Sequence, residues 1–322
     1  MGRAPADLFG EQNMAIDDNM TPEEALFSLL GSQGPQPPIL YHYTSMAGLL
    51  SILETGRIRA SHVRYLNDRS ELAAIWEAVI KQLEMRRDSA KTTEEGAYLS
   101  RIIELATGKQ LGNEFVASFS ENGDDLSQWR SYCPGGAGFS IGFATDALRS
   151  QWISNAAGGK PSFVGGQLLK VRYLDEKAIV HLDSFIDAAL QLASQLKGMP
   201  GISGQPISRE QVVPAWFSVF APAYKHAAFR HECEWRMVLT KPHKPMPGQR
   251  FREGKSTVIP YVEVELNRNT EFKLSDKYMV QKVVIGPTPN VELSLEALRS
   301  LFASKGHPEV SVEASSIPYR DW

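Results

Sequence analysis

Residues 115–143 read FVASFSENGDDLSQWRSYCPGGAGFSIGF, and this stretch predicts two strands joined by a polar connection. Residues 115–120 alternate with a period of two, and GFSIGF at 138–143 is short, apolar and bounded by glycine. The connection carries Trp129 and Arg130, and connections of this kind on a rigid scaffold commonly hold binding sites. The structural alternative is a loop in which Trp129 is buried and Arg130 forms an ion pair.

The composition predicts a soluble globular protein. Of the 322 residues, 43% are hydrophobic and 22% are charged, and the formal net charge is −3. This balance excludes a broad basic surface for nucleic acid but allows a local basic groove. Two cysteines are too few for a disulfide framework, so reduced thiols and a cytoplasmic location are expected. No secretory signal and no apolar run of about 20 residues is visible, so no membrane partner is expected.

The first 38 residues are predicted as an arm that precedes a single domain. Thr21 suits the N-cap of a short helix, with proline at the first helical position and glutamate at the third. The Pro- and Gly-rich segment 31–38 is predicted as a linker. Residues 39–322 contain no internal repeat and no regular βαβ alternation, so an α+β fold is expected for them.

Hydrophobic periodicity predicts further elements along this domain. Strands are expected at 39–44, 168–173, 232–239, 258–266, 278–286 and 310–315. Helices are expected at 46–54, 69–88, 94–107, 146–152, 178–196, 212–224 and 293–305. The helix at 46–54 directly follows the first strand, so its free amides lie near His42 and favour anions.

Two carboxylates and a guanidinium are predicted to share one face of the strand at 232–239. Glu232, Glu234 and Arg236 alternate with core positions such as Trp235. This arrangement is costly unless the charges are paired or face a cleft. The structural interpretation is a Glu–Arg ladder with a neighbouring strand. The functional interpretation is a carboxylate that orients a hydroxyl or stabilises a cation.

Standard metal and nucleotide motifs are missing from the sequence. The two cysteines and His231 match no standard zinc spacing, so no metal site is predicted from them. No P-loop, GxGxxG or HExxH motif occurs. A metal-dependent, nuclease-like hydrolase that uses Asp68, Glu71 and Glu234 is kept as one alternative function.

Seven segments between Leu40 and Arg320 together resemble a known family. They are, in order, LYHYTS, YLNDRSE, SFSENGDDLSQWRSY, GFSIGF, HECEWRMVL, IGP and SSIPYR. This ordered set resembles the bacterial family catalogued as domain of unknown function 2971. The opening strand and helix also look like those of the ADP-ribosyltransferase superfamily, including the DNA-modifying toxin DarT. That resemblance implies a split, mostly antiparallel sheet with flanking helices. It also implies that the protein binds NAD as its substrate.

The resemblance to ADP-ribosyltransferases implies roles for individual residues. His42, with Thr44 nearby, would hold the adenosine ribose of NAD, and Ser118 or Ser120 would line the nicotinamide. Glu234 would be the catalytic carboxylate that orients the nicotinamide ribose and the acceptor. The other residues expected at the cofactor are Tyr43, Asn67, Asp68, Gln128, Trp129, Arg130 and Arg320.

The physical chemistry of NAD cleavage agrees with these roles. Positive charge builds up on the sugar as the nicotinamide–ribose bond breaks, and a carboxylate near the sugar stabilises that charge. Glu234 is preferred for this role, with Glu232 as the alternative. The diphosphate would be held by Arg130, Arg320 or the free amides that follow Thr44.

The sequence therefore predicts an NAD-dependent ADP-ribosyltransferase or NAD hydrolase. The acceptor would be a macromolecule, either a nucleic acid or a protein. By analogy alone, the protein would be a bacterial toxin or anti-phage defence effector with an antitoxin or regulatory partner. The rival from another class is a non-catalytic sensor domain that binds a nucleotide or a nucleic acid. Truncation of Glu234 distinguishes the two, because a sensor has no turnover to lose.

Overall fold

The computed structural model describes residues 36–66, 69–108, 114–133, 138–148, 152–153, 162–163, 165–195, 208–240, 248–254, 256–266 and 279–319. Of the predicted arm and linker, only residues 36–38 fall within these ranges, so the short helix expected before them lies outside the described residues. The predicted site residues Asn67, Asp68 and Arg320 also lie outside them.

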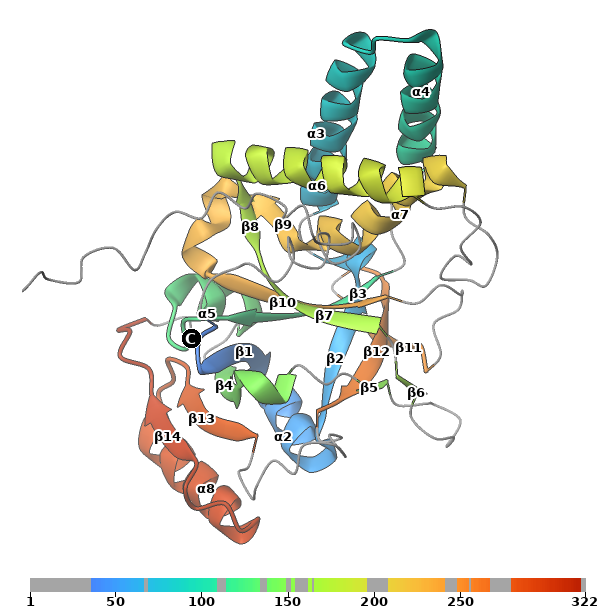
Figure 1. Ribbon diagram of the computed structural model, residues 1–322. Coiled ribbons are helices and arrows are strands. Elements are labelled where there is room, and N and C mark those ends of the chain that lie inside the picture. Colours follow the sequence, from blue (N-terminus) through green and yellow to red (C-terminus); the bar gives the residue numbers. More distant parts are fainter. Residues whose placement is uncertain are drawn as a thin grey trace, which may run out of the picture.

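One large sheet forms the centre of the described part of the chain (Figure 1). Its strands are β1 (Ile39–Ser45), β2 (Arg57–His62), β3 (Phe115–Ser120), β4 (Gly138–Ala144), β5 (Trp152–Ile153), β6 (Ser162–Phe163), β7 (Gly165–Lys170), β10 (Glu234–Thr240), β11 (Arg250–Glu253), β12 (Val258–Glu265), β13 (Val280–Ile285) and β14 (Ser311–Ala314). Their order is β14-β13-β4-β1-β3-β2-β12-β5-β6, with β10 on β3, β7 on β10 and β11 on β12. Only the pairing of β13 with β14 is parallel among the described strands of this sheet, so the fold is α+β with a mixed, mostly antiparallel sheet.

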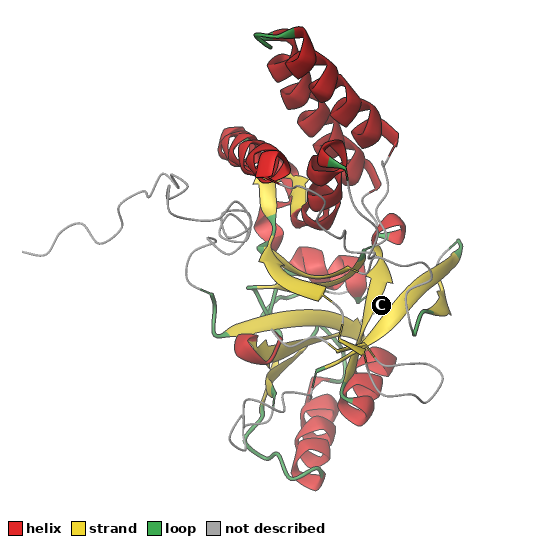
Figure 2. Cartoon of the chain, turned by 45° about the vertical axis from the view of Figure 1, so that its right-hand side comes forward, coloured by secondary structure: helices red, strands yellow, loops and turns green. Residues whose placement is uncertain are grey.

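Helices cover the sheet from two sides (Figure 2). The α-helices are α2 (Met46–Thr55), α3 (Arg69–Asp88), α4 (Thr93–Gly108), α5 (Leu126–Tyr132), α6 (Glu176–Gln195), α7 (Arg209–Phe220) and α8 (Val291–Ser304). Helices α3, α4, α6 and α7 lie above the sheet in Figure 1, and α2 and α8 lie below it. No described helix has the length and apolar character needed to cross a membrane.

Shorter elements complete the described fold. Strands β8 (Arg172–Leu174) and β9 (Tyr224–His226) form a separate parallel pair. The 3₁₀ helices are η1 (Val63–Tyr65), η2 (Thr145–Leu148), η3 (Ala221–Ala223) and η4 (Ala227–Glu232). Because η4 directly connects β9 to the start of β10, it joins the small parallel pair to the large sheet.

Alternation along the strands sends side chains to two separate cores. Phe119 of β3 and Trp235 of β10 belong to the core that α2 and α8 cover. Val116 and Val238 of the same two strands belong to the core formed with α3, α4, α6 and α7. Trp235 is 1% exposed, so its predicted core position is confirmed.

Strands β1 and β2 diverge along one edge of β3. On the opposite edge, β10 pairs with β3 from Glu234 opposite Ser120 to Leu239 opposite Phe115. On the first edge, β1 pairs only at Ser120, and β2 pairs only at Phe115 and Val116. The middle of this edge therefore has no partner among the described strands, and α2 connects the two strands that separate there.

Most predicted elements are confirmed within a few residues, but the connection after β3 is not a continuous loop. Residues Leu126–Tyr132 form α5. Asp125 caps this helix by accepting hydrogen bonds from the amides of Ser127 and Gln128. The one-turn amphipathic signal of so short a helix is too weak to distinguish from a polar loop.

Two predicted helices also need correction. The helix expected at 146–152 is only the 3₁₀ turn η2, because residues Trp152–Ile153 pair with β12 as β5 and tertiary pairing overrides local propensity. The helix expected at 212–224 ends at Phe220. Pro222 lacks the amide hydrogen that a helix needs, and the chain continues as η3 and β9.

Candidate functional site

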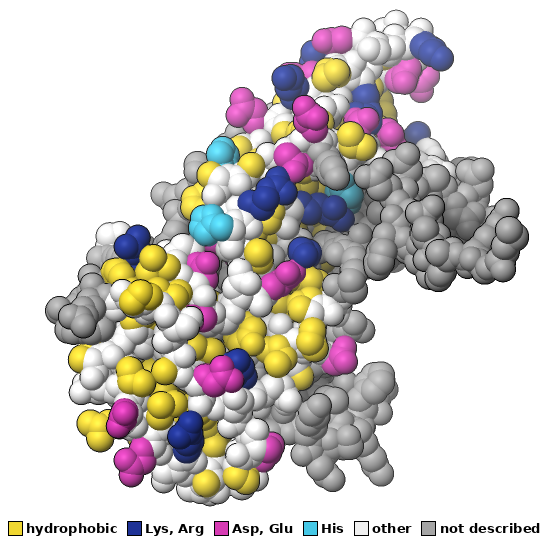
Figure 3. Space-filling view, turned by 90° about the vertical axis from the view of Figure 1, so that its left-hand side faces the viewer, with side chains coloured by type: hydrophobic (Ala, Val, Ile, Leu, Met, Phe, Trp, Pro, Cys, Tyr) yellow, Lys and Arg dark blue, Asp and Glu magenta, His cyan; other side chains and the backbone are white. Residues whose placement is uncertain are grey.

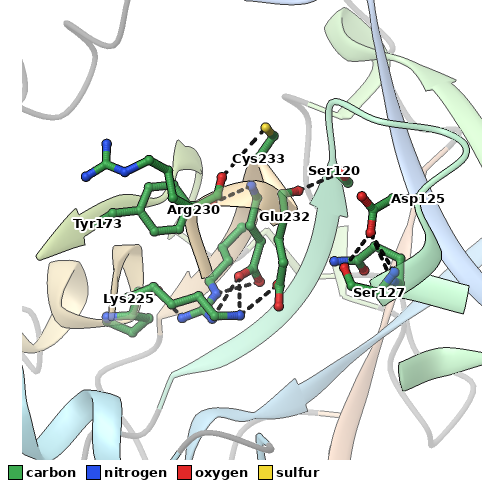
Figure 4. A network of polar contacts seen from close by, with 12 residues as sticks. Ser120, Asp125, Ser127, Tyr173, Lys225, Arg230, Glu232 and Cys233 are labelled. Atoms are coloured by element: carbon green, nitrogen blue, oxygen red, sulfur yellow. Dashed lines mark hydrogen bonds and ion pairs between the residues drawn. The ribbon is translucent and has the colours of Figure 1, made fainter. Parts of the chain in front are cut away.

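A buried group of charged side chains lies where β9, η4 and β10 meet (Figure 4). Lys225 Nζ contacts Glu232 Oε2 at 2.8 Å and Glu234 Oε2 at 3.1 Å. Arg236 binds the same Glu234 carboxylate, with Nε 2.8 Å from Oε1 and Nη2 3.1 Å from Oε2. These two cations and two carboxylates form one network, which is called the charge cluster below.

The local backbone explains how the charge cluster is assembled. Glu234 and Arg236 lie on one face of β10, as alternation predicts. Glu232 does not belong to this strand, contrary to the prediction, because it is the last residue of η4. Cys233 separates the two carboxylates with a left-handed φ of 44°, a conformation that costs a non-glycine residue about 1–2 kcal/mol. This turn places both carboxylates on Lys225.

Lys225 and Glu234 are ionised at neutral pH despite their burial. Burial alone would raise the pKa of Glu234, but the charges of Arg236 and Lys225 and hydrogen bonds from Arg236 and Ser118 lower that pKa to about 2. Burial alone would lower the pKa of Lys225, but the charges of Glu234 and Glu232 raise it above its ordinary value. The fold therefore holds two full positive and two full negative charges out of bulk water.

The two carboxylates differ in accessibility. The Glu232 side chain is 13% exposed, and its Oε1 forms no hydrogen bond or ion pair with a described residue. The Glu234 side chain is 5% exposed, and cations occupy both of its oxygens. Tyr132 of α5 exposes 41% of its surface. Burial of its hydroxyl and the charge of Glu234 raise the pKa of Tyr132 to about 12, so this aromatic side chain lies beside the cluster.

Ser118 connects His42 to the charge cluster. His42 Nδ1 lies 2.9 Å from the Ser118 carbonyl oxygen, on the edge of β3 that β1 and β2 leave unpaired. A carbonyl only accepts, so Nδ1 carries the hydrogen. Burial lowers the pKa of His42, so the ring is neutral and Nε2 is an acceptor. The Ser118 side chain lies on the face of β3 that faces Glu234 and Arg236, and it helps to lower the pKa of Glu234.

Side-chain alternation nevertheless places His42 and Glu234 on opposite faces of the sheet. His42 pairs with Ile141 of β4, and its ring centre lies 5.7 Å from that of Phe119; both neighbours belong to the core under α2 and α8. Glu234 pairs with Ser120 and faces the other layer. A ligand that contacts both His42 and Glu234 must therefore pass along the unpaired edge of β3.

Tyr43 and Trp129 are buried and hold the segment between β3 and α5. Their ring centres are 4.7 Å apart. The Tyr43 hydroxyl donates to the Asn122 carbonyl at 2.8 Å and accepts from the Asp125 amide at 3.0 Å. Trp129 is 1% exposed, and its Nε1 donates to Asp124 Oδ1 at 2.8 Å. The structural interpretation of a buried Trp129 is confirmed.

Of the remaining predicted cofactor residues, only Ser120 contacts the charge cluster among the described residues, and its hydroxyl donates to the Glu232 carbonyl oxygen at 2.7 Å. Arg130 forms no ion pair within the described part of the chain, so the alternative of an Arg130 ion pair stays untested there, and its guanidinium lies 4.9 Å from the ring centre of Tyr319. Gln128 is 7% exposed. The Thr44 hydroxyl lies against Gly48 in the first turn of α2, where an added Cβ would come within 2.0 Å of it.

No group of three or more His, Cys, Asp and Glu side chains among the described residues is arranged to hold a metal ion. Asp68 and the side chain of Glu71, which the hydrolase alternative requires, lie outside the described part. Glu234, its third residue, is poorly suited to a metal because cations already bind both of its oxygens.

Three residues of this region were missed by sequence reasoning, namely Lys225, Tyr132 and Tyr173. Lys225 directly follows the segment predicted as a buried helix, and no local pattern shows that it pairs with residues in the following strand. The Tyr173 hydroxyl accepts a hydrogen bond from the Glu234 amide at 3.0 Å. Of these three residues, only Tyr132 could have been recognised from the sequence, because a large aromatic residue within a polar connection is uncommon.

Basic and aromatic groups surround the charge cluster. Lys225 Nζ lies 4.6 Å from the ring centre of Phe229, and the Arg230 guanidinium lies 5.5 Å from that of Tyr173. His231 is exposed beside them. Figure 3 shows this side of the molecule, on which basic and histidine side chains gather between the helical end at the top and a more hydrophobic lower area.

Comparison with known proteins gives a match over part of the chain. No curated protein matches the sequence, and neither comparison connects it to ADP-ribosyltransferases. Residues 128–237 match the model of a family described as Protein of unknown function (DUF2971). This segment includes the whole charge cluster but not His42 or Ser118. Over residues 128–237 the chain is therefore similar to that family.

Proposed function

We propose that the protein is an NAD-consuming enzyme of the ADP-ribosyltransferase type, with its site between His42, Ser118 and the charge cluster. The observation that carries this proposal is the position of Ser118, whose carbonyl oxygen contacts His42 and whose side chain lies on the face of the sheet that carries Glu234. These three residues are far apart in the sequence and lie on three neighbouring strands, with His42 and Glu234 on opposite faces of the sheet. The divergence of β1 and β2 at β3 supports the proposal, because the resemblance to this superfamily implies a split sheet.

The protonation states of the site suit the binding of a sugar. A neutral His42 with a free acceptor at Nε2 takes a hydrogen bond from a ribose hydroxyl. The Glu232 oxygen that no described cation contacts supplies the negative charge that stabilises an oxocarbenium-like sugar. The exposed ring of Tyr132 offers a flat surface beside the charge cluster for the nicotinamide.

The reaction breaks the bond between the anomeric ribose carbon and the nicotinamide nitrogen. Nicotinamide leaves as a neutral molecule with both bonding electrons, and positive charge develops on the sugar. A nucleophilic oxygen or nitrogen of the acceptor then bonds to the anomeric carbon and gives its proton to a carboxylate. Water in place of the macromolecular acceptor gives hydrolysis of NAD.

We assign the substrate-facing role to Glu232 and a positioning role to Glu234. Glu232 has an accessible carboxylate with one oxygen unoccupied, whereas Glu234 is enclosed by Lys225 and Arg236. Glu234 holds Lys225 in place, and Lys225 in turn orients Glu232. This assignment reverses the sequence-based preference between the two residues.

Labelled NAD tests the proposal. The purified protein is incubated with NAD labelled in the adenylate part and with protein, DNA or RNA from a cell extract, and free nicotinamide is measured in parallel. Wild type should release nicotinamide and transfer label to one class of macromolecule, or to water. His42→Ala should lose NAD affinity, because its ring no longer accepts from the ribose. Absence of nicotinamide release with every acceptor, and with none, would sink the enzymatic proposal.

A non-catalytic nucleotide sensor is the second candidate, and the burial of Glu234 favours it. A carboxylate whose oxygens are all bound by internal cations is common in structural networks. In that case NAD or another nucleotide binds near His42 without being cleaved. Saturable NAD binding in calorimetry, with no nicotinamide formed over hours, would identify the sensor.

A further inference from the structure

A second group of basic residues lies elsewhere on the same sheet, where β2, β12 and β11 run side by side (Figure 1). Tyr261 of β12 pairs with Ser61 of β2 on one side and with Arg250 of β11 on the other. Arg59 and Arg252 lie two residues away from Ser61 and Arg250 along their strands. Alternation therefore directs all five side chains to one face.

Carboxylates neutralise some of the arginines on this face and leave others unmatched. Arg57 contacts Glu265 at 3.0 Å and Glu263 at 3.7 Å, and Arg250 contacts Glu263 at 3.2 Å. Arg59 is exposed and has no carboxylate partner within the described residues. The positive charges of this face therefore outnumber its negative ones.

Arg252 is the second unmatched arginine, and it reaches across β12. Its Nη2 donates to Ser61 Oγ at 3.1 Å, and no described carboxylate pairs with it. Burial and the nearby charge of Arg59 lower the pKa of Arg252, which shows that the two guanidinium groups repel each other. The ring of Tyr261, whose centre is 5.1 Å from the Arg59 guanidinium carbon, helps to hold Arg59 in this position.

We propose that Arg59, Arg252 and the Ser61 hydroxyl bind a phosphate group. Planar guanidinium groups donate paired hydrogen bonds to phosphate oxygens, and an anion between them removes their mutual repulsion. Ser61 Oγ accepts from Arg252 and keeps its own hydrogen to donate to the ligand. The ligand class is a phosphate ester, either as a free small molecule or in the backbone of a polynucleotide. The site shares no residue with the charge cluster, so the inference does not rest on the proposed function.

Matched variants test this site. Arg59→Gln/Arg252→Gln removes the two unmatched charges. Arg87→Gln/Arg101→Gln is the control, because it removes the same charge from α3 and α4, where the arginines pair with exposed carboxylates. Inorganic phosphate and adenosine monophosphate are titrated by calorimetry, and a short single-stranded oligonucleotide by fluorescence anisotropy. Circular dichroism spectra confirm that both variants are folded.

We expect wild type and the control variant to bind alike, and the site variant to bind about tenfold more weakly or worse. For the oligonucleotide, the loss of two phosphate contacts should reduce the slope of log affinity against log salt by about 1.4. Binding of the two small probes identifies a free phosphate ester as the ligand, and binding of the oligonucleotide alone identifies a polynucleotide backbone. The proposal is overturned if wild type binds none of the three probes saturably, or if the site variant binds as wild type does.

Discussion

The charge cluster lies beside β10, and the arginine pair, Arg59 of β2 and Arg252 of β11, lies on another part of the same large sheet. The two regions balance their charges differently. Lys225 and Arg236 are 2% and 5% exposed, and carboxylates contact both of them. Arg59 and Arg252 are more accessible and have no carboxylate partner among the described residues. Desolvation explains the difference, because a buried cation is stable only when paired, whereas water screens an exposed one. Unmatched charge at the surface is therefore free to bind a ligand.

The largest effect on stability is expected from removal of the cation at the centre of the charge cluster. Lys225→Met leaves Glu232 without its partner and Glu234 with only one, so the free energy of unfolding should fall by about 3–5 kcal/mol. Urea denaturation followed by circular dichroism measures the change. Arg59→Met is the matched control and should cost less than about 1 kcal/mol. Equal, small losses in both variants would show that burial does not distinguish the two regions.

The loss of unfolding free energy at acidic pH should depend on Glu234. Its pKa of about 2 in the folded protein lies below the ordinary 4.5. The stabilisation is therefore fully present above pH 4.5 and is lost as the pH falls toward 2, and it amounts to roughly 3 kcal/mol. The difference in unfolding free energy between wild type and Glu234→Gln should shrink as the pH falls from 4.5 toward about 2. A constant difference across that range would contradict the assigned pKa.

The arginine pair should behave in the opposite way in a stability measurement. Arg59→Gln/Arg252→Gln removes two charges that repel each other and no ion pair, so the free energy of unfolding should stay within about 0.5 kcal/mol of wild type. Thermal and urea unfolding check this in the absence of phosphate. A loss of several kcal/mol would mean that these arginines are part of the folded core, as Lys225 and Arg236 are.

Local sequence patterns predicted the strands well, but they did not predict the contacts that bring the site residues together. Alternation alone correctly placed Trp235 in the core and Glu234 with Arg236 on the other face. It failed at Glu232, because a left-handed residue such as Cys233 interrupts a strand without any signal in its neighbours. Propensity cannot show such a conformation when the residue is not glycine.

Long-range pairing was beyond the reach of the sequence. The partner of both carboxylates is Lys225, which lies in a short strand created by its pairing with β8. The role of Trp129 could not be predicted for the same reason, since an aromatic residue in a polar connection suits a binding site and a buried structural position equally. Only the hydrogen bond to Asp124 and the contact with Tyr43 decide between them.

The central claim is that an accessible Glu232 acts on NAD while Glu234 positions it, and nicotinamide release tests this most directly. Release is measured for wild type, Glu232→Gln and Glu234→Gln under conditions in which circular dichroism shows all three to be folded. Glu232→Gln should lower kcat on the order of a hundredfold with little change in KM and in unfolding free energy. For Glu234→Gln, the main effect should be a lower free energy of unfolding, and kcat should fall less than it does for Glu232→Gln. If Glu232→Gln keeps wild-type turnover while Glu234→Gln abolishes it, the roles are reversed, and if both keep it, the charge cluster is purely structural.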